Sequence, residues 1–234
     1  MTHTFKLIDF NFYDEDAGDK EDEDYNMYQD NHEFRIQIFG INEAGETGCI
    51  YVEGFNPFFF VKVPESWGAA EQNMFIGHIK TKIGNYYSDS ITLAKLLSRK
   101  KLYGFDAGKL HQFLLIKFAN TRAMNKVKNL WYTYKKNGER TLRREGYKWN
   151  DASLELYEAN IPPILRLFHM REISPSGWIT FNEEDTEVCM LKKTTCKYEY
   201  TLHYKNIISL PEKETIVPYK ICSFDIEASS SHGD

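Results

Sequence analysis

The sequence predicts an α+β protein, in which a mainly antiparallel β domain, barrel-like or sandwich-like, carries flanking helices. The chain of 234 residues contains 15 Tyr and 16 Phe, side chains that strands favour along with many β-branched residues. Most of its apolar segments are short and are separated by turn residues, whereas few stretches have helical spacing. A hydrophobic content of 42% is sufficient for a packed core.

The N-terminal segments are expected to form strands around an acidic loop. Thr4–Phe12 alternates apolar and polar residues and reads as an opening strand, and residues 13–30 carry an acidic run that predicts a solvated loop. His32–Asn42 and Gly48–Glu53 have the pattern of a hairpin, with Glu43–Glu46 as its turn.

Three consecutive phenylalanines begin the next expected strand, Phe58–Pro64. Such a cluster invites a base-stacking hypothesis. The alternation of side chains instead favours packing in the core, because Phe58 and Phe60 share a face and Val61 and Val63 extend the apolar run.

Two longer helices are predicted, at Glu65–Lys82 and at Asn120–Lys136, the latter ending at Asn137-Gly138. Ile91–Arg99 is compatible with a short helix or a strand. Leu110–Phe118 reads as a strand that follows a turn.

The last third is expected to be a basic loop over Thr141–Trp149 and a short helix from Asp151 to Tyr157. A strand over Ile164–Phe168 is expected after the Pro162-Pro163 pair. Strands at Glu187–Leu191 and Cys196–Tyr204 complete a largely antiparallel set.

Positive charge is concentrated between Lys95 and Lys148, where fifteen basic residues face three acidic ones although the whole chain has a net charge of −5. Such a stretch, interleaved with Tyr and Trp, is what contact with a nucleic-acid backbone requires. An equally weighted alternative to nucleic-acid binding is that these residues form a solvated basic surface over an ordinary hydrophobic core. The candidate phosphate ligands are two clusters, Arg99-Lys100-Lys101 and Arg143-Arg144.

The segment from Ile216 to Glu227 is predicted to be a strand whose two faces differ. Cys222, Phe224 and Ile226 would enter a core, while Asp225 and Glu227 would project together from the other face. Paired carboxylates suit Mg²⁺, although an isolated Asp-x-Glu also arises by chance. The four cysteines lack Cys-x-x-Cys spacing, which indicates a reduced intracellular setting and no zinc site.

Three ordered motifs resemble the family-B DNA polymerases, in particular the delta-like and giant-virus types. Ile221–Glu227 is similar to their first exonuclease motif, which reads Phe-Asp-Ile-Glu after an apolar strand. Gly54–Phe60, preceded by the strand with Phe39-Gly40, is similar to their pre-exonuclease region. Tyr157–Met170, with Gly177-Trp178, resembles the run that precedes the exonuclease domain.

The resemblance implies that residues 1–215 are a pre-exonuclease N-terminal domain and that 216–234 begin a ribonuclease-H-like 3′→5′ exonuclease domain. Asp225 and Glu227 would then be catalytic metal ligands for Mg²⁺ in an incomplete site, because two later motifs supply the other acids. The parent activity implied is nucleotidyl transfer in DNA replication, with nucleotide binding and proofreading. The chain alone is expected to be an inactive scaffold with template-side DNA contacts.

The implied partners are template and primer DNA and the remaining polymerase domains or a complementary split chain, with a processivity factor as a further candidate. No membrane segment is expected. A viral source would place the protein inside a host cell, in a cytoplasmic viral factory or the nucleus. Two alternatives remain. One is a stand-alone module that binds single-stranded nucleic acid, and the other is a small metal-dependent nuclease that uses Asp225, Glu227 and carboxylates from the acidic run.

Overall fold

The computed structural model describes residues 1–16, 28–101, 104–136, 138–188 and 191–226, and it confirms the α+β class. The helices are α1 (Ala69–Ile83), α2 (Asn85–Ser88), α3 (Thr121–Lys128) and α4 (Pro163–Arg171). The strands are β1 (Thr2–Asp16), β2 (His32–Ile41), β3 (Thr47–Glu53), β4 (Phe58–Lys62), β5 (Ile91–Lys100), β6 (Leu110–Phe118), β7 (Tyr132–Tyr134), β8 (Arg140–Leu142), β9 (Tyr147–Trp149), β10 (Ala152–Tyr157), β11 (Trp178–Asn182), β12 (Thr186–Val188), β13 (Tyr198–His203) and β14 (Ile208–Leu210). None of the helices in these ranges is long and apolar enough to cross a membrane.

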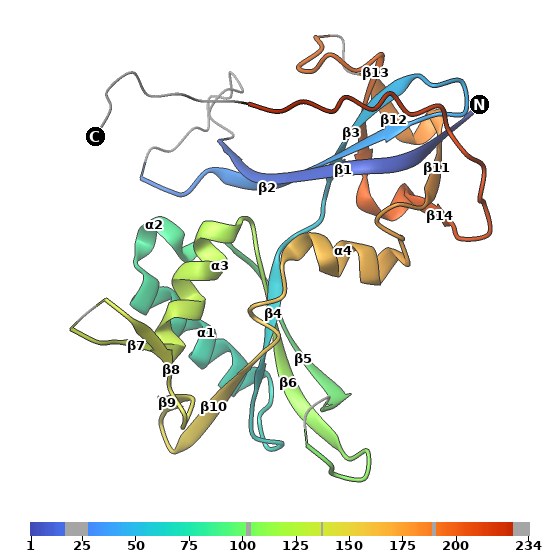
Figure 1. Cartoon of the computed structure of the whole chain (residues 1–234). Helices are drawn as coiled ribbons and strands as arrows, with labels where there is room; N and C mark the ends of the chain where they lie inside the picture. Colours follow the sequence, from blue (N-terminus) through green and yellow to red (C-terminus); the bar gives the residue numbers. More distant parts are fainter. Residues whose placement is uncertain (17–27, 102–103, 137, 189–190, 227–234) are drawn as a thin grey trace, which may run out of the picture.

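The strands form two main sheets (Figure 1). Each sheet has its own hydrophobic core. The first lobe is a seven-stranded sheet in the order β12-β13-β3-β2-β1-β11-β14, in which β13 and β3 are parallel and the other pairs antiparallel. Helix α4 contributes Leu167 to this core, where it joins Phe5, Ile36, Ile50 and Phe181.

The second lobe is a five-stranded antiparallel sheet in the order β5-β6-β4-β10-β9. Helices α1 and α3 supply Phe75 and Val127 to its core, which also contains Phe59, Ile116 and Trp131. The β7–β8 hairpin forms a separate two-stranded ladder.

The predicted hairpin is confirmed, since β2 and β3 pair antiparallel with Ile36 opposite Val52. Its turn is closed by Asn42, whose side chain accepts the backbone N–H of Glu46 at 2.9 Å. Gly45 has a φ of 81°, a conformation that glycine adopts without steric cost.

The helix predicted over Asn120–Lys136 is half as long as expected. Asn120 caps it by accepting the backbone N–H of Ala123 at 2.8 Å, but α3 ends at Lys128 and Tyr132 already begins β7. Burial of Trp131 fixes the break, because its indole N–H donates to the carbonyl of Leu154 at 2.8 Å. Gly138 therefore belongs to the β7–β8 connection, while Asn137 lies outside the described residues.

The structure resolves one open prediction in the middle of the chain and revises three others. The ambiguous stretch at Ile91 is strand β5. The predicted helix from Asp151 is strand β10, and the expected basic loop contains strands β8 and β9. The predicted strand at Ile164 lies in α4, because Pro163 occupies the first helical turn, where a missing N–H costs nothing.

The first residues of the acidic stretch belong to a strand. Strand β1 continues to Asp16, so that Asp14 and Glu15 belong to the sheet and not to a loop. Glu15 pairs with Arg35 at 3.0 Å. The remaining part of the predicted loop, residues 17–27, lies outside the described residues.

The segment after β14 is not a strand in the structure. Val217 is buried beside Ile41 and Trp178, but beyond it Ile221, Phe224 and Ile226 are 78–90% exposed, and Cys222 is exposed as well. The predicted burial of Cys222, Phe224 and Ile226 is therefore wrong for this chain. Alternating apolar residues become buried only against a paired strand and a covering layer, and none of the described strands pairs with this segment.

Carboxylates hold the two lobes together. Asp14 of β1 accepts hydrogen bonds from the backbone N–H and hydroxyl of Thr121 at 2.9 and 2.6 Å, and so caps α3 from the other lobe. Asp30 accepts from the side chains of Asn120 and Ser90 at 2.8 and 3.2 Å.

We expect Asp14→Ala to destabilise the protein by about 1–2 kcal/mol, because the first turn of α3 loses its external cap. Urea unfolding followed by circular dichroism measures the change. Asp151→Ala, at an exposed position outside the junction, serves as the control and is expected to change stability by less than about 0.5 kcal/mol. Equal stability of the Asp14→Ala variant and the wild type would contradict this role.

Candidate nucleic-acid interface

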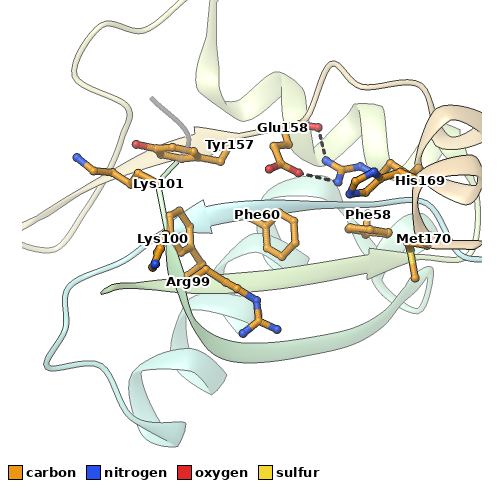
Figure 2. Close-up of a pocket in the computed structure, with 11 residues that line it drawn as sticks. Phe58, Phe60, Arg99, Lys100, Lys101, Tyr157, Glu158, His169 and Met170 are labelled. Carbon is orange, nitrogen blue, oxygen red and sulfur yellow. Dashed lines mark hydrogen bonds and ion pairs between the residues drawn. The ribbon is translucent and has the colours of Figure 1, made fainter. Parts of the chain in front are cut away.

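A cavity with a volume of about 520 Å³ lies where β4, β5, β6 and β10 meet α4. We call this cavity the aromatic pocket. Figure 2 shows Arg99, Lys100 and Lys101 at one end of it and His169 and Met170 of α4 at the other. It is lined by Phe58, Phe60, Arg99, Lys100, Lys101, Phe113, Tyr157, Glu158, Arg166, His169 and Met170.

A row of edge-to-face aromatic rings forms one wall of the aromatic pocket. The ring centroids of Phe58 and Phe60 are 5.7 Å apart, those of Phe60 and Phe113 are 6.4 Å apart, and those of Phe113 and Tyr157 are 5.1 Å apart. Such rings offer π faces and edges to a planar ligand.

The predicted core packing is confirmed only in part for Phe58, which packs against the first core while half-buried, and the fully buried face of this strand is the opposite one. Phe59, Val61 and Val63 are the buried residues of this stretch, whereas Phe58 and Phe60 are half-buried and line the pocket. The alternation itself is observed, but the sequence does not distinguish which face meets the core.

Arg166 lies over the aromatic wall and is fixed by Glu158. Its guanidinium carbon is 4.4 Å from the centroid of Phe58 and 5.7 Å from that of Phe60. Two guanidinium nitrogens donate to the carboxylate and the carbonyl of Glu158, both at 2.7 Å (dashed in Figure 2). Glu158 adopts a φ of 58°, an uncommon conformation for a residue other than glycine, and it turns the chain from β10 toward α4.

The first predicted basic cluster borders this pocket. Arg99 and Lys100 are exposed at the end of β5, and no carboxylate among the described residues pairs with either. Lys101 is held differently, because its ammonium lies 3.8 Å from Asp106, which also accepts from His111 at 2.6 Å. The hydrogen bond from His111 and the charge of Lys101 lower the pKa of Asp106, so this carboxylate stays ionised and holds the loop after β5.

The second predicted basic cluster borders an adjoining cavity of about 380 Å³, which we call the arginine pocket. Arg143 and Arg144 are exposed there, again without a carboxylate partner in the described part of the chain. Gly146 makes their loop possible: its φ is 70°, and a Cβ at this position would lie 2.2 Å from the carbonyl oxygen of Leu154. The arginine pocket is lined by Trp131, Leu142, Arg143, Arg144, Gly146, Glu155, Leu156, Tyr157 and Glu158.

Tyr157 and Glu158 line both pockets, so the two basic clusters border one continuous surface. Burial, followed by the charge of Glu155, raises the pKa of Tyr157 to about 12, and the ring therefore remains a neutral phenol that donates to Glu155 at 3.1 Å. The sequence did not single out Phe113, Tyr157 or Arg166 as site residues. Their role depends on the pairing of β10 with β4 and of β4 with β6.

Asp225, one of the two predicted metal ligands, lies in a different part of the molecule. Asp225 is exposed in the unpaired segment, where its carboxylate accepts the backbone N–H of Ile226 at 2.8 Å. Glu227 lies outside the described residues. Within the described ranges, no three His, Cys, Asp or Glu side chains come together as a metal-binding group.

The fold belongs to a class already seen in DNA polymerases. The solved structure of the family B DNA polymerase from the hyperthermophilic archaeon Pyrobaculum calidifontis superposes on 93% of this chain with a TM-score of 0.55. The sequences are 13% identical and the match covers 21% of that chain, so this likeness concerns the fold alone.

Sequence comparisons point to viral DNA polymerases and to one polymerase family model. Residues 154–234 match the family model described as DNA polymerase family B, exonuclease domain. The DNA polymerase of Phaeocystis pouchetii virus is 48% identical over 239 residues, which is all of this chain and 23% of the relative. That of Acanthamoeba polyphaga mimivirus is 26% identical over 97% of this chain and 12% of the relative.

The chain is thus similar to the N-terminal region of DNA polymerases of the giant-virus type, and its residues 154–234 match the family-B exonuclease domain. It spans less than a quarter of the length of these two relatives.

We expect Arg166→Met to destabilise the protein by about 2–4 kcal/mol, because a half-buried Glu158 carboxylate would lose its only charged partner in the described structure. Chemical denaturation measures the loss. The second change Glu158→Gln should recover part of it, since no unpaired charge then remains. The control is Arg99→Met on the pocket rim, which should stay within about 0.5 kcal/mol of the wild type; a similar loss in both single variants would refute the assigned pairing.

Proposed function

We propose that this chain is the N-terminal part of a replicative DNA-directed DNA polymerase with 3′→5′ proofreading, and that it acts as a scaffold that contacts the template strand. The observation that carries the proposal is the continuous surface of the aromatic and arginine pockets, which combines unpaired cations with aromatic rings. The viral DNA polymerases that the whole chain resembles support it.

A single strand fits this surface better than a duplex does. The two pockets are concave and lined with aromatic side chains, and unstacked bases expose π faces to such rings. Arg143 and Arg144 can hold phosphate oxygens bidentately, whereas Lys100 supplies a point charge. The proposed arrangement places phosphates at the basic rims and a base against the aromatic wall near Tyr157.

The proposed metal chemistry belongs to the assembled exonuclease domain. Carboxylate oxygens of Asp225 and Glu227 suit Mg²⁺, and a metal pair would polarise the phosphodiester and activate water there. Since no three His, Cys, Asp or Glu side chains of the described residues form a metal-binding group, we propose that the other acids come from the rest of the polymerase or a complementary chain. The 234 residues alone are then inactive.

Two competing functions receive less support. A stand-alone single-strand-binding module does not account for the match to the exonuclease family model over residues 154–234. A small nuclease that uses the acidic run conflicts with the engagement of Asp14 by Thr121 and of Glu15 by Arg35. A processivity factor and a location at the site of viral replication inside the host cell remain part of the proposal.

The first test measures single-strand binding by this chain as a function of salt. The double change Arg143→Ala/Arg144→Ala should weaken binding of an oligothymidylate about tenfold at low salt and reduce the salt slope by about 1.4, the value for two lost phosphate contacts on a single strand. Fluorescence anisotropy in a salt series gives both quantities.

The matched control is Lys205→Ala/Lys220→Ala, which removes the same charge from exposed positions outside both pockets. It should leave the slope nearly unchanged. Equal losses in the two double variants would mean that binding reports net charge only, and the proposed interface would be wrong.

The second test concerns the exonuclease in the complete polymerase. Asp225→Ala and Glu227→Ala should each reduce 3′→5′ degradation of a labelled primer by more than about 100-fold, while primer extension continues. Substitution of a residue that only supports a metal ligand typically costs roughly 10–100-fold, and loss of the ligand itself should cost more. Both activities are read on one sequencing gel. Undiminished degradation in either variant would remove that residue from the metal site.

A further inference from the structure

Lys128, the last residue of α3, is a buried cation without a counter-charge. Lys128 is 8% exposed, and its side chain forms no ion pair or hydrogen bond with any described residue. Lysine is almost never buried without a partner, because an isolated ammonium loses its hydration and gains nothing in return. The position therefore needs a physical explanation.

A second positive charge makes the situation less favourable. Burial lowers the pKa of Lys128, and the positive charge of Arg140 lowers it further. Arg140 donates a hydrogen bond to the side chain of Asn129 at 3.2 Å and lies over the ring of Tyr132. Like Lys128, it has no carboxylate partner within the described ranges. Two neighbouring cations without an anion favour the binding of one from solution.

Lys128 lines a cavity in which such an anion has room. The cavity has a volume of about 250 Å³ and lies between α3, the end of β1 and the turn before α4. Asn125 and Asn160 are exposed at this cavity and carry amide groups that can donate hydrogen bonds. Phe12, Pro162 and Pro163 supply apolar walls, and the cavity shares no lining residue with the aromatic or arginine pocket.

We propose that this cavity binds a phosphate-class oxyanion, with Lys128 as its ion-pairing group and the amides of Asn125 and Asn160 as further donors. The anion is either inorganic phosphate or pyrophosphate, or a phosphate group of a nucleic acid. An ammonium is a compact point charge that suits a phosphate oxygen, and the partly apolar walls strengthen the pairing by excluding water.

Thermal unfolding of this chain tests the site, with inorganic phosphate exchanged for chloride at constant ionic strength. Phosphate should raise the Tm of the wild type in a saturable manner, since a ligand that binds only the folded state stabilises it. Lys128→Met should abolish this rise and should itself have a higher Tm without phosphate, because the uncompensated charge is gone. Lys128→Arg keeps the charge and should retain the response.

Lys126→Met is the matched control, since Lys126 is exposed on the same helix, and it should respond to phosphate as the wild type does. A phosphate-dependent rise of equal size in Lys128→Met and the wild type would overturn the proposal, because it would reflect a general salt effect. If Lys128→Met does not fold, Asn160→Ala, at an exposed position, should lower the phosphate affinity several-fold; an unchanged affinity would likewise overturn it.

The source of the anion is decided by a second titration with oligothymidylates that do or do not carry a 5′-phosphate. A Lys128-dependent response to the phosphorylated oligonucleotide alone assigns the site to a nucleic-acid end. A response to pyrophosphate or phosphate alone assigns it to the free ion. A response that is independent of Lys128 in every titration contradicts the site.

Discussion

The pairing of Arg166 with Glu158 is the constraint on which the arrangement of the site depends. Arg166 belongs to α4, whose Leu167 and Phe168 are part of the first core, yet its guanidinium lies over two rings of β4 in the second sheet. The hydrogen bonds to Glu158 fix where β10 ends and α4 begins. One ion pair therefore sets the relative position of the aromatic wall, α4 and the turn between the two pockets.

The fold could be predicted from the sequence where local pattern and long-range pairing agree. The β2–β3 hairpin follows from alternation and a turn with Asn42 and Gly45, and both lie within one local unit. Prediction failed where tertiary contacts decide the outcome. Periodicity continued the helix beyond Lys128, but the buried indole of Trp131 bonds to Leu154 and the chain turns into β7. The Pro162-Pro163 pair was read as favouring a strand, although a proline also fits the first turn of a helix.

The same distinction explains how much of the site could be predicted. Charge counting identified Arg99, Lys100, Arg143 and Arg144 because excess charge is visible in the sequence itself. It did not identify Tyr157 as the residue between them, since that requires β10 to lie beside β4. For the segment that ends at Asp225 the alternation is real, but burial of its apolar face requires a neighbouring strand that the described part of this chain does not supply.

The distribution of carboxylates makes the proposed strand-binding surface electrostatically consistent. Glu155 and Glu158 line the arginine pocket and would repel a phosphate if their charges were uncompensated. Glu155 lies 3.5 Å from Lys62, and Glu158 is paired with Arg166 at 2.7 Å, so both are balanced within the protein. The unpaired charges that remain at the two rims are positive. A single nucleic-acid strand that follows the rims meets positive charge at the basic clusters and a nearly neutral wall between them. Its bases then contact aromatic rings instead of carboxylates.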